Sequence, residues 1–531
     1  PLMIVVLSLL ATIGVMILLG MPGSTAVQIL PVFLLTVGIC DAVHILALVY
    51  RFRMEGADEE TSVARAMGHS GLAVLMTSVT TAAGMASFVT AEMAAVMHLG
   101  ILAPIGVGIA FIYTIVLLPA LLAIFPLPVA RRGSLGRGVF PLESLLVSVG
   151  SFAARHPFRV LFPTSLLVVI AVLGALQIRF SQNSLSWFPE GDRIRVDVTA
   201  LDEGMRGSVS LDLVVDTGKP GGLYEPAVLE ALDAFLTRVV LLPVEPLYIG
   251  KTMSILDIVK ETHQALGENH EEMRRIPETR QAIAQELLLF ENSGSDDTEE
   301  FVDSEFRIAR ISMRVPFEDA LLYPKLVSDI RELASDRLAG LVEFELTGLM
   351  TLLAQIFDAV IRSMMRSYAF AIAVITPLMM LLMGSLRRGL VSLVPNLLPM
   401  LAVLGVTGWL DIAIDATTMM VGAMVIGIAV DDTIHFMHKF NRYFEELGDV
   451  ESAIRETLRT TGSALLFTTF VLIVGFSSFG LAGMSNMRIF GGLSAMATVV
   501  AFVADLLVTP ALLTIVEGRR ARGRRVAVQS A

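Results

Sequence analysis

Two adjacent aspartates and a histidine lie within an apolar stretch of this chain. Residues 427–435 read Gly-Ile-Ala-Val-Asp-Asp-Thr-Ile-His. Asp431 and His435 are four positions apart and Asp432 and His435 three, so on a helix each pair can meet. Two neighbouring carboxylates in a medium of low dielectric constant cannot both ionise cheaply, and histidine titrates near neutral pH. The spacing predicts a site that binds and relays protons; the alternative is a structural cluster of polar residues that joins helices.

The same polar residues recur near the start of the chain. A shift of 391 residues places Asp41 on Asp432 and His44 on His435 without gaps. Arginine, glycine, threonine and proline residues further along also fall in register, which chance similarity between apolar helices does not produce. Cys40, however, stands where the second copy has Asp431. We therefore expect an asymmetric site in which the second copy carries most of the charge.

Other polar residues in apolar stretches are candidates for the same site. The stretch that follows each aspartate carries two hydroxyl side chains, Thr468 and Thr469 in one copy and Thr77 and Ser78 in the other. These hydroxyls either bond the carboxylates across helices or only link neighbouring helices, and both interpretations stay open. Asp505, deep in the last apolar stretch, either joins the proton relay or pairs with a neighbour for structural reasons.

The elements that carry these residues are predicted to be membrane-spanning helices. Hydrophobic residues make up 54% of the chain and charged residues 17%, a balance far from that of soluble proteins. Roughly 20 apolar residues are needed to cross a bilayer as a helix. Ten stretches satisfy this length: 2–20, 26–49, 71–90, 98–125, 160–177, 368–384, 390–410, 416–438, 463–482 and 489–516.

The charges of the loops predict the orientation of these spans. Basic residues cluster in alternate loops and in the tail, and Lys439 belongs to one such loop, whereas the other loops hold almost none. Positive loops stay in the cytoplasm. Residues 181–360 hold 33 Asp and Glu against 16 Lys and Arg, so this acidic block is predicted to lie outside. Asp411, Asp415 and Glu92 are expected to be solvated near the outer interface.

The repeat predicts the organisation of the whole chain. Each copy of the aspartate-histidine span is followed by a basic loop, so the two copies run in the same direction and form parallel repeats. Compared with the second copy, the first lacks one span, an outer domain and a second span, so we expect roughly 230 further residues before Pro1, giving twelve spans in total. The predicted segments are four spans of the first repeat (1–125), a cytoplasmic link (126–159), the first span of the second repeat (160–177), a periplasmic domain (178–361), five spans (362–516) and a basic cytoplasmic tail (517–531).

The acidic block alternates between strand and helix patterns. Period-two alternation predicts strands, and apolar residues at helical spacing predict amphipathic helices. This order favours an α+β domain of the split βαβ type, in which His263 and His270 are solvated helix residues. The predicted strands are 205–218, 304–315 and 342–347, and the helices are 225–240, 253–266, 278–290 and 321–338, with a further helix running from 349 into the span at 368.

The chain resembles the resistance–nodulation–division (RND) superfamily, in particular its single-chain predicted exporters and the MMPL-like lipid exporters. The resemblance rests on the repeated six-span plan, the outer domain within a repeat, and Gly427-x-x-x-Asp431-Asp432 followed by His435. Sterol-sensing-domain proteins share this core. In the superfamily, carboxylates at this place carry protons during antiport, so the resemblance implies that role for Asp431 and Asp432 and, more weakly, for Asp41.

The function predicted from residues and resemblance together is proton-driven export of a hydrophobic or amphiphilic molecule, with a lipid favoured, across or out of a bacterial inner membrane. Protons would be the coupling ion, with no cofactor or metal. Expected partners are the substrate, the membrane, a periplasmic carrier or adaptor, and a second copy of the chain, but no nucleic acid. The alternatives are a lipid or sterol sensor that transports nothing and an auxiliary of protein secretion. No set of catalytic residues favours an enzyme.

Overall fold

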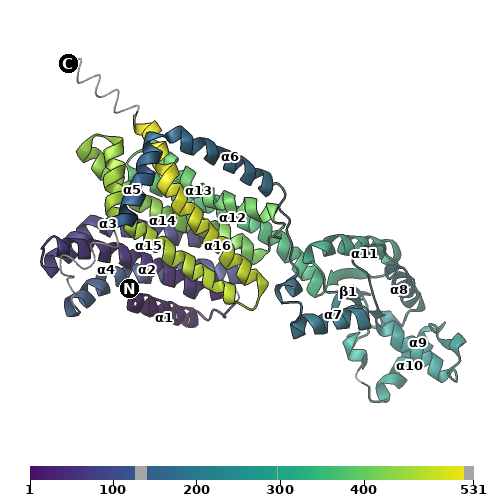
Figure 1. Cartoon of the computed structure of the whole chain (residues 1–531). Helices are drawn as coiled ribbons and strands as arrows, with labels where there is room; N and C mark the ends of the chain where they lie inside the picture. Colours follow the sequence, from purple (N-terminus) through teal and green to yellow (C-terminus); the bar gives the residue numbers. More distant parts are fainter. Residues whose placement is uncertain (25, 126–139, 296, 519–531) are drawn as a thin grey trace. The chain divides into compact units, whose positions relative to one another are not determined.

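A computed structural model describes residues 1–24, 26–125, 140–295 and 297–518. The chain divides into two compact units. We call them the membrane unit, Pro1–Phe180 with Val360–Ala531, and the α+β unit, Ser181–Ala359. The boundary between the units falls within one long helix, α12 (Leu349–Met383). Each unit has its own hydrophobic core, and Figure 1 shows the helices and strands that belong to each.

Helices of the membrane unit carry the apolar stretches of the sequence. Within the described residues, nine helical segments are long and apolar enough to span a bilayer. The first predicted span forms a shorter apolar helix, α1, of 17 residues, which is the lower end of the length that crosses hydrocarbon. The chain is therefore a polytopic helical membrane protein. The helices are α1 (Leu2–Leu18), α2 (Leu30–Met54), α3 (Glu59–Ala86), α4 (Ala94–Ile124), α6 (Pro157–Ala175), α12, α13 (Leu386–Trp409), α14 (Ala416–Leu447), α15 (Val450–Ser477) and α16 (Ser485–Val503).

The internal repeat of the sequence is also a repeat of structure. Helices α3 and α15 begin and end at positions offset by 391 residues, and α4 and α16 begin at the same offset. The capping interactions repeat as well: the Asp58 carboxylate accepts a hydrogen bond from the Thr61 amide (3.2 Å), and Asp449 accepts one from the Ser452 amide (2.9 Å). Each cap satisfies an amide that the first helical turn leaves without a partner. Equivalent residues thus start equivalent helices.

Helix α14 is the central helix of the membrane unit. Its most apolar window of 18 residues is wholly buried within the protein, and it contacts α3, α13, α15 and α16. A helix buried on every side needs no polar face. Its few polar side chains are therefore positioned by neighbouring helices.

Two expectations about polar residues of the membrane unit are wrong. Asp415, expected to be solvated, is 7% exposed and accepts hydrogen bonds from the Thr418 amide and hydroxyl, both at 2.7 Å. It caps α14, which hydropathy alone does not reveal. Lys439, assigned to a loop, lies within α14 and is 6% exposed, because the helix continues beyond the apolar run.

The predicted link 126–159 is partly a helix, α5 (Phe140–Arg155), while residues 126–139 lie outside the described part. Helix α5 packs on α15, where the Arg155 guanidinium pairs with the Glu451 carboxylate at 2.7 Å. A β-carbon on Gly150 would lie 2.1 Å from the Leu458 side chain, so this glycine permits the close approach. Of the predicted tail, 519–531 likewise lie outside the described residues.

The α+β unit is built on a four-stranded antiparallel sheet in the order β2-β3-β1-β4, the order of a split βαβ fold. Alternate residues of β1 are buried, and the strands share one hydrophobic core with helices α8 and α11, which contact each other. The strands are β1 (Val209–Asp216), β2 (Thr252–Met253), β3 (Ile308–Val315) and β4 (Glu343–Thr347); the helices are α7 (Arg193–Met205), α8 (Pro226–Val239), α9 (Ile255–Leu266), α10 (Arg280–Asn292) and α11 (Tyr323–Leu338).

Two elements of this unit, α7 and β2, have no counterpart in the sequence prediction. Strand β2 is two residues long, too short for a recognisable alternation. The expectation for His263 is wrong: its Nδ1 lies 2.8 Å from the Glu286 carboxylate, and the two side chains are 16% and 11% exposed. The pair joins α9 to α10, whereas His270 is exposed as expected.

Candidate functional site

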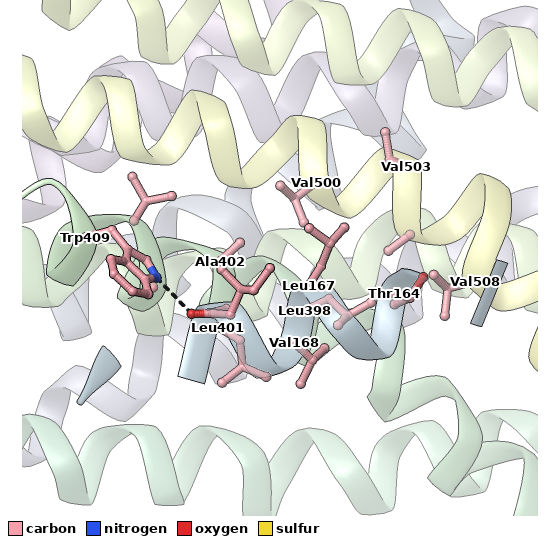
Figure 2. Close-up of a pocket in the computed structure, with 15 residues that line it drawn as sticks. Thr164, Leu167, Val168, Leu398, Leu401, Ala402, Trp409, Val500, Val503 and Val508 are labelled. Carbon is pink, nitrogen blue, oxygen red and sulfur yellow. Dashed lines mark hydrogen bonds between the residues drawn. The ribbon is translucent and has the colours of Figure 1, made fainter. Parts of the chain in front are cut away.

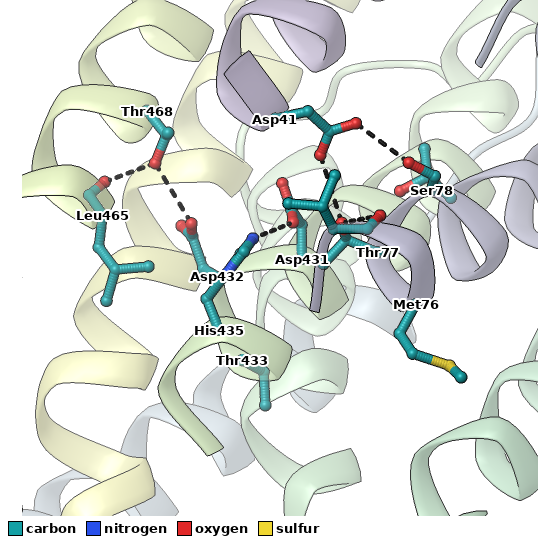
Figure 3. A network of polar contacts seen from close by, with 12 residues as sticks. Asp41, Met76, Thr77, Ser78, Asp431, Asp432, Thr433, His435, Leu465 and Thr468 are labelled. Atoms are coloured by element: carbon teal, nitrogen blue, oxygen red, sulfur yellow. Dashed lines mark hydrogen bonds and ion pairs between the residues drawn. The ribbon is translucent and has the colours of Figure 1, made fainter. Parts of the chain in front are cut away.

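The aspartates and histidine singled out in α14 lie in the interior of the membrane unit. Asp431, Asp432 and His435 are 9%, 5% and 3% exposed. Because successive residues of a helix point about 100° apart, the two neighbouring carboxylates face different helices. Figure 3 shows Asp432 directed towards α15 and Asp431 towards α3. The pair therefore connects α14 to one helix from each repeat.

A threonine on the neighbouring helix holds Asp432. The Thr468 hydroxyl lies 3.3 Å from the Asp432 Oδ1 atom and 2.8 Å from the Leu465 carbonyl oxygen of its own helix. The Thr469 hydroxyl donates to the same carbonyl at 2.7 Å. Both threonines are buried, so these polar atoms are shielded from solvent.

The first repeat reproduces this arrangement at Asp41. The Thr77 hydroxyl lies 3.3 Å from the Asp41 Oδ1 atom, the same distance as in the second repeat, and the Ser78 hydroxyl donates to Oδ2 at 3.0 Å. The Asp41 side chain is 2% exposed. The two aspartate-threonine pairs are thus equivalent contacts within two repeats that share one core (Figure 3).

The histidines meet where the repeats meet. The rings of His44 and His435 stack with centroids 3.7 Å apart and planes inclined by 12°. The His435 Nε2 atom lies 3.6 Å from the Asp431 Oδ1 atom, which is within reach of an ion pair but too long for a hydrogen bond. Neither of these two atoms, nor His44 Nε2, has a hydrogen-bond partner among the described residues. A small movement would bring the carboxylate and imidazole into direct contact.

Glycines allow the two repeats to approach so closely. A β-carbon on Gly84 of α3 would lie 3.1 Å from the Cα atom of Gly427 in α14, and the Thr81 hydroxyl donates to the Gly427 carbonyl at 3.3 Å. Small residues at a crossing let helix backbones touch in membranes. The equivalent crossing brings Gly475 against Thr36. These contacts place Asp431 beside α3.

Asp505 belongs to the same interior but has its own partners. It lies in a π-helical turn, Ala504–Val508, which follows α16, and it is 3% exposed. Its Oδ1 atom accepts hydrogen bonds from the hydroxyls of Thr433 (2.8 Å) and Thr509 (3.0 Å). The Thr433 hydroxyl also lies 2.6 Å from Asn396 Oδ1. Such turns occur frequently at functional sites.

Sequence reasoning missed three residues around Asp505: Thr433, Thr509 and Asn396. Thr509 follows Asp505 by four positions, so helical spacing could have indicated it, whereas Thr433 directly follows Asp432 and lies on another helix than Asp505. Asn396 comes from α13 and required the fold. Lys439 follows His435 by one helical turn, as His435 follows Asp431, which forms a line of ionisable residues along α14.

The arrangement can bind and exchange protons. Four carboxylates and two imidazoles share the interior of a membrane unit, where an unpaired charge costs several kcal/mol. Hydroxyl groups lie beside Asp41, Asp432 and Asp505, and the His435 imidazole lies beside Asp431. Among the described residues no group of three or more His, Cys, Asp and Glu side chains is arranged to hold a metal ion.

Comparison with known proteins identifies the family of the chain. Residues 260–529 match the model of the MMPL family, and residues 1–124 match that of the Patched sterol-sensing domain. A protein of Methanocaldococcus jannaschii described as a membrane protein is 32% identical over 134 residues, which is 25% of this chain. The match covers 34% of that relative's length. The chain is therefore an RND-like permease whose first repeat resembles a sterol-sensing domain. It belongs to the MMPL family.

Proposed function

We propose that the chain is the membrane part of an exporter that uses proton influx to move a hydrophobic or amphiphilic molecule, a lipid being favoured, out of the membrane. The MMPL family consists of transporters, and the chain itself supplies an acidic pair in its most buried helix. The observation that carries the proposal is that Asp431 lies beside α3 of the first repeat and that His435 stacks on His44 of that repeat, since a proton bound at this contact can alter how the repeats pack.

The energies involved are of the right size for this mechanism. An ionised side chain at the centre of a bilayer costs about 2.5–3.5 kcal/mol on insertion scales. The membrane potential supplies about 2.3 kcal/mol per charge for each 100 mV. Protonation of one carboxylate therefore changes the energy of the site by about as much as one proton gains by crossing the membrane, and can drive one step of a cycle.

The proposed orientation follows the loop charges. Basic loops and the C-terminal tail lie in the cytoplasm, and the acidic α+β unit lies in the periplasm of a bacterial inner membrane. There it receives the substrate from the membrane unit and passes it to a periplasmic carrier or adaptor. Protons enter from the same side, since this is the direction of the gradient that drives influx.

The proposal is tested with the full-length protein in liposomes that carry a pH gradient. Asp431→Asn and Asp432→Asn, singly and together, are expected to reduce lipid-dependent proton flux, because an amide cannot take up a proton. The expected reduction is about tenfold or more, which corresponds to about 1.4 kcal/mol or more of lost coupling free energy. The matched control is Asp411→Asn, an exposed carboxylate of the membrane unit. Undiminished flux in the double variant would overturn the proton role.

A second candidate function is a lipid or sterol sensor without transport. The match of residues 1–124 to the Patched sterol-sensing domain favours it. In a sensor the buried acids only join helices, so a sterol or lipid would bind without any pH gradient and no proton would move. Lipid-dependent proton flux through the wild-type protein separates the two, because a sensor gives none.

A further inference from the structure

An apolar groove opens between α6, α13 and α16, away from the acidic pair. Its volume is about 330 Å³, which lies at the lower end of the range for small-molecule sites. Figure 2 shows aliphatic side chains of the three helices along it, with the Trp409 indole at one end. Leu167 of α6, Leu401 of α13 and Val500 of α16 line its walls.

Both ends of the groove are closed by close packing. At the end near Trp409, a β-carbon on Gly408 would lie 1.8 Å from the Gly174 carbonyl oxygen, so α6 and α13 touch through their backbones. At the other end, Val160 of α6 joins Ala511 and Val508 in a small apolar cluster. The groove therefore has a fixed length along α6.

The walls present no free hydrogen-bonding side chain. Of the two polar residues, Thr164 donates its hydroxyl to the Val160 carbonyl at 2.8 Å. The Trp409 indole N–H donates to the Ile170 carbonyl at 2.9 Å. An occupant with polar atoms would lose its bonds to water and gain none here. Only hydrocarbon suits the groove.

The groove is continuous with the lipid-facing surface of the membrane unit. Leu167 and Val503, which line it, are 64% and 44% exposed. On the same helix as Leu167, Phe162 and Leu166 are 77% and 55% exposed. Because these helices span the membrane, the medium at the mouth of the groove is the acyl chains of lipids.

The π-helical turn with Asp505 separates this groove from the acidic interior. Ala504 and Val508 of the turn line the groove. Asp505, which follows Ala504, points away from the groove and accepts a hydrogen bond from the Thr433 hydroxyl at 2.8 Å. A second, small cavity of about 10 Å³ on that side is lined by Asp432 and Asp505. One turn of backbone thus contacts both environments.

We propose that the groove binds one acyl chain of a membrane lipid and that the bound chain acts on Asp505 through the π-helical turn. The inference rests on the proposed function, because it gives the transported or regulating lipid a place beside a proton-binding carboxylate. A chain seated against Ala504 and Val508 restricts the turn and so the position of the Asp505 carboxylate relative to Thr433. An empty groove leaves the turn free to move.

Binding is tested by photolabelling without a pH gradient. The full-length protein is reconstituted in phosphatidylethanolamine liposomes containing a phospholipid with a diazirine near the end of one acyl chain, and adducts are mapped by mass spectrometry. Adducts are expected to concentrate on Leu167, Leu401 and Val503. Val500→Phe, which fills the groove, should lower this labelling by about tenfold, as loss of contact with about two methylene groups would.

The matched control is Val499→Phe, the same substitution at the adjacent residue, which is 43% exposed and does not line the groove. On α6, Val168→Phe and Val172→Phe form a second pair, for use if Val500→Phe does not fold. Equal labelling in the groove-filling and control variants, or labelling spread evenly over the lipid-facing surface, would overturn the site.

The action on Asp505 is tested with dicyclohexylcarbodiimide, which modifies buried carboxyl groups. The rate of modification of Asp505 is expected to differ by about threefold between Val500→Phe and Val499→Phe, roughly 0.6 kcal/mol; equal rates would overturn the coupling. Neither measurement needs transport. Loss of proton flux alone would refute the proposed export but not the acyl-chain site. Labelling spread evenly over the lipid-facing surface would refute the site but not the export.

Discussion

The carboxylates of the interior are alike in chemistry and different in their neighbours. Asp41 and Asp432 are equivalent in the repeat, and each lies 3.3 Å from an equivalent threonine hydroxyl. Asp431 has no counterpart, since Cys40 occupies that position, and its Oδ1 atom faces the His435 imidazole. Asp431 therefore gives the second repeat an additional carboxylate that the first repeat lacks, at the contact between the two repeats.

Thr468→Val tests whether the hydroxyl positions Asp432 for proton transfer. A hydrogen bond to a charged group contributes about 1.5–3 kcal/mol, so lipid-dependent proton flux is expected to fall by about tenfold or more. The control is Thr457→Val on the same helix, where a buried hydroxyl donates only to the Ala453 carbonyl of its own helix. Equal effects of the two substitutions would assign Thr468 a purely structural role.

At the scale of elements, helix crossings decide which residues meet. Gly84 lies against backbone, because a β-carbon there would be 3.1 Å from the Gly427 Cα atom. A β-carbon on Gly427 would find its nearest neighbour at 3.8 Å, an ordinary contact. The crossing of α3 and α14 therefore constrains Gly84 more than Gly427.

Gly84→Ala is expected to destabilise the membrane unit by about 1–3 kcal/mol, the usual cost of overpacking. Gly427→Ala should be close to neutral. Gly71→Ala, on the same helix as Gly84 but with nothing within 4 Å of the new β-carbon, should stabilise the helix by up to about 1 kcal/mol. Thermal unfolding in detergent measures the stability of the three variants. A similar loss of stability for Gly71→Ala and Gly84→Ala would contradict the claim that the helix crossing constrains Gly84.

An ion pair between the last residue of β1, Asp216, and Arg307, which directly precedes β3, predicts how the stability of the α+β unit depends on pH. Arg307 donates two hydrogen bonds to Asp216, at 2.8 and 2.7 Å, and the Gly218 amide donates a third at 2.7 Å. These contacts lower the pKa of the Asp216 carboxyl to about 2 from its ordinary 3.8. The stabilisation is therefore fully present above about pH 4 and is lost as the pH falls towards 2.

Asp216→Asn is thus expected to lower the unfolding temperature of the α+β unit at pH 7, with the difference from wild type shrinking below pH 4. The chain has two tryptophans, so Trp409→Phe leaves Trp187 as a fluorescent reporter within this unit. Asp336→Asn, an exposed carboxylate, is the control. A difference that persists unchanged at the lowest pH would exclude the ionised carboxylate as its source.

At the scale of the whole molecule, hydropathy and the repeat predicted the membrane helices, because burial in hydrocarbon demands long apolar runs. They could not reveal α5 or the buried part of α14 around Lys439, where helices continue past the apolar run. Of the candidate site, the sequence indicated the acidic pair and its threonines. Asn396, which lies on another helix and bonds the Thr433 hydroxyl, and the π-helical turn around Asp505 leave no local pattern in the sequence.

The orientation of the chain is testable because its one cysteine, Cys40, is buried. Asp336→Cys in the α+β unit is expected to react with a membrane-impermeant maleimide on intact cells. Glu60→Cys, at the exposed start of α3, should react only after the membrane is opened. Labelling in the opposite order would invert the topology and the proposed direction of transport.

The stacked histidines carry one more consequence. His44 and His435 are equivalent residues and their ring centroids are 3.7 Å apart, so the approximate twofold axis between the repeats must run between the two rings. On the proposed proton role, a proton bound by one of the two rings would lie on one side of this axis. Even if the two repeats had identical sequences, a single proton at this axis would make them unequal, and its transfer from ring to ring would exchange their roles.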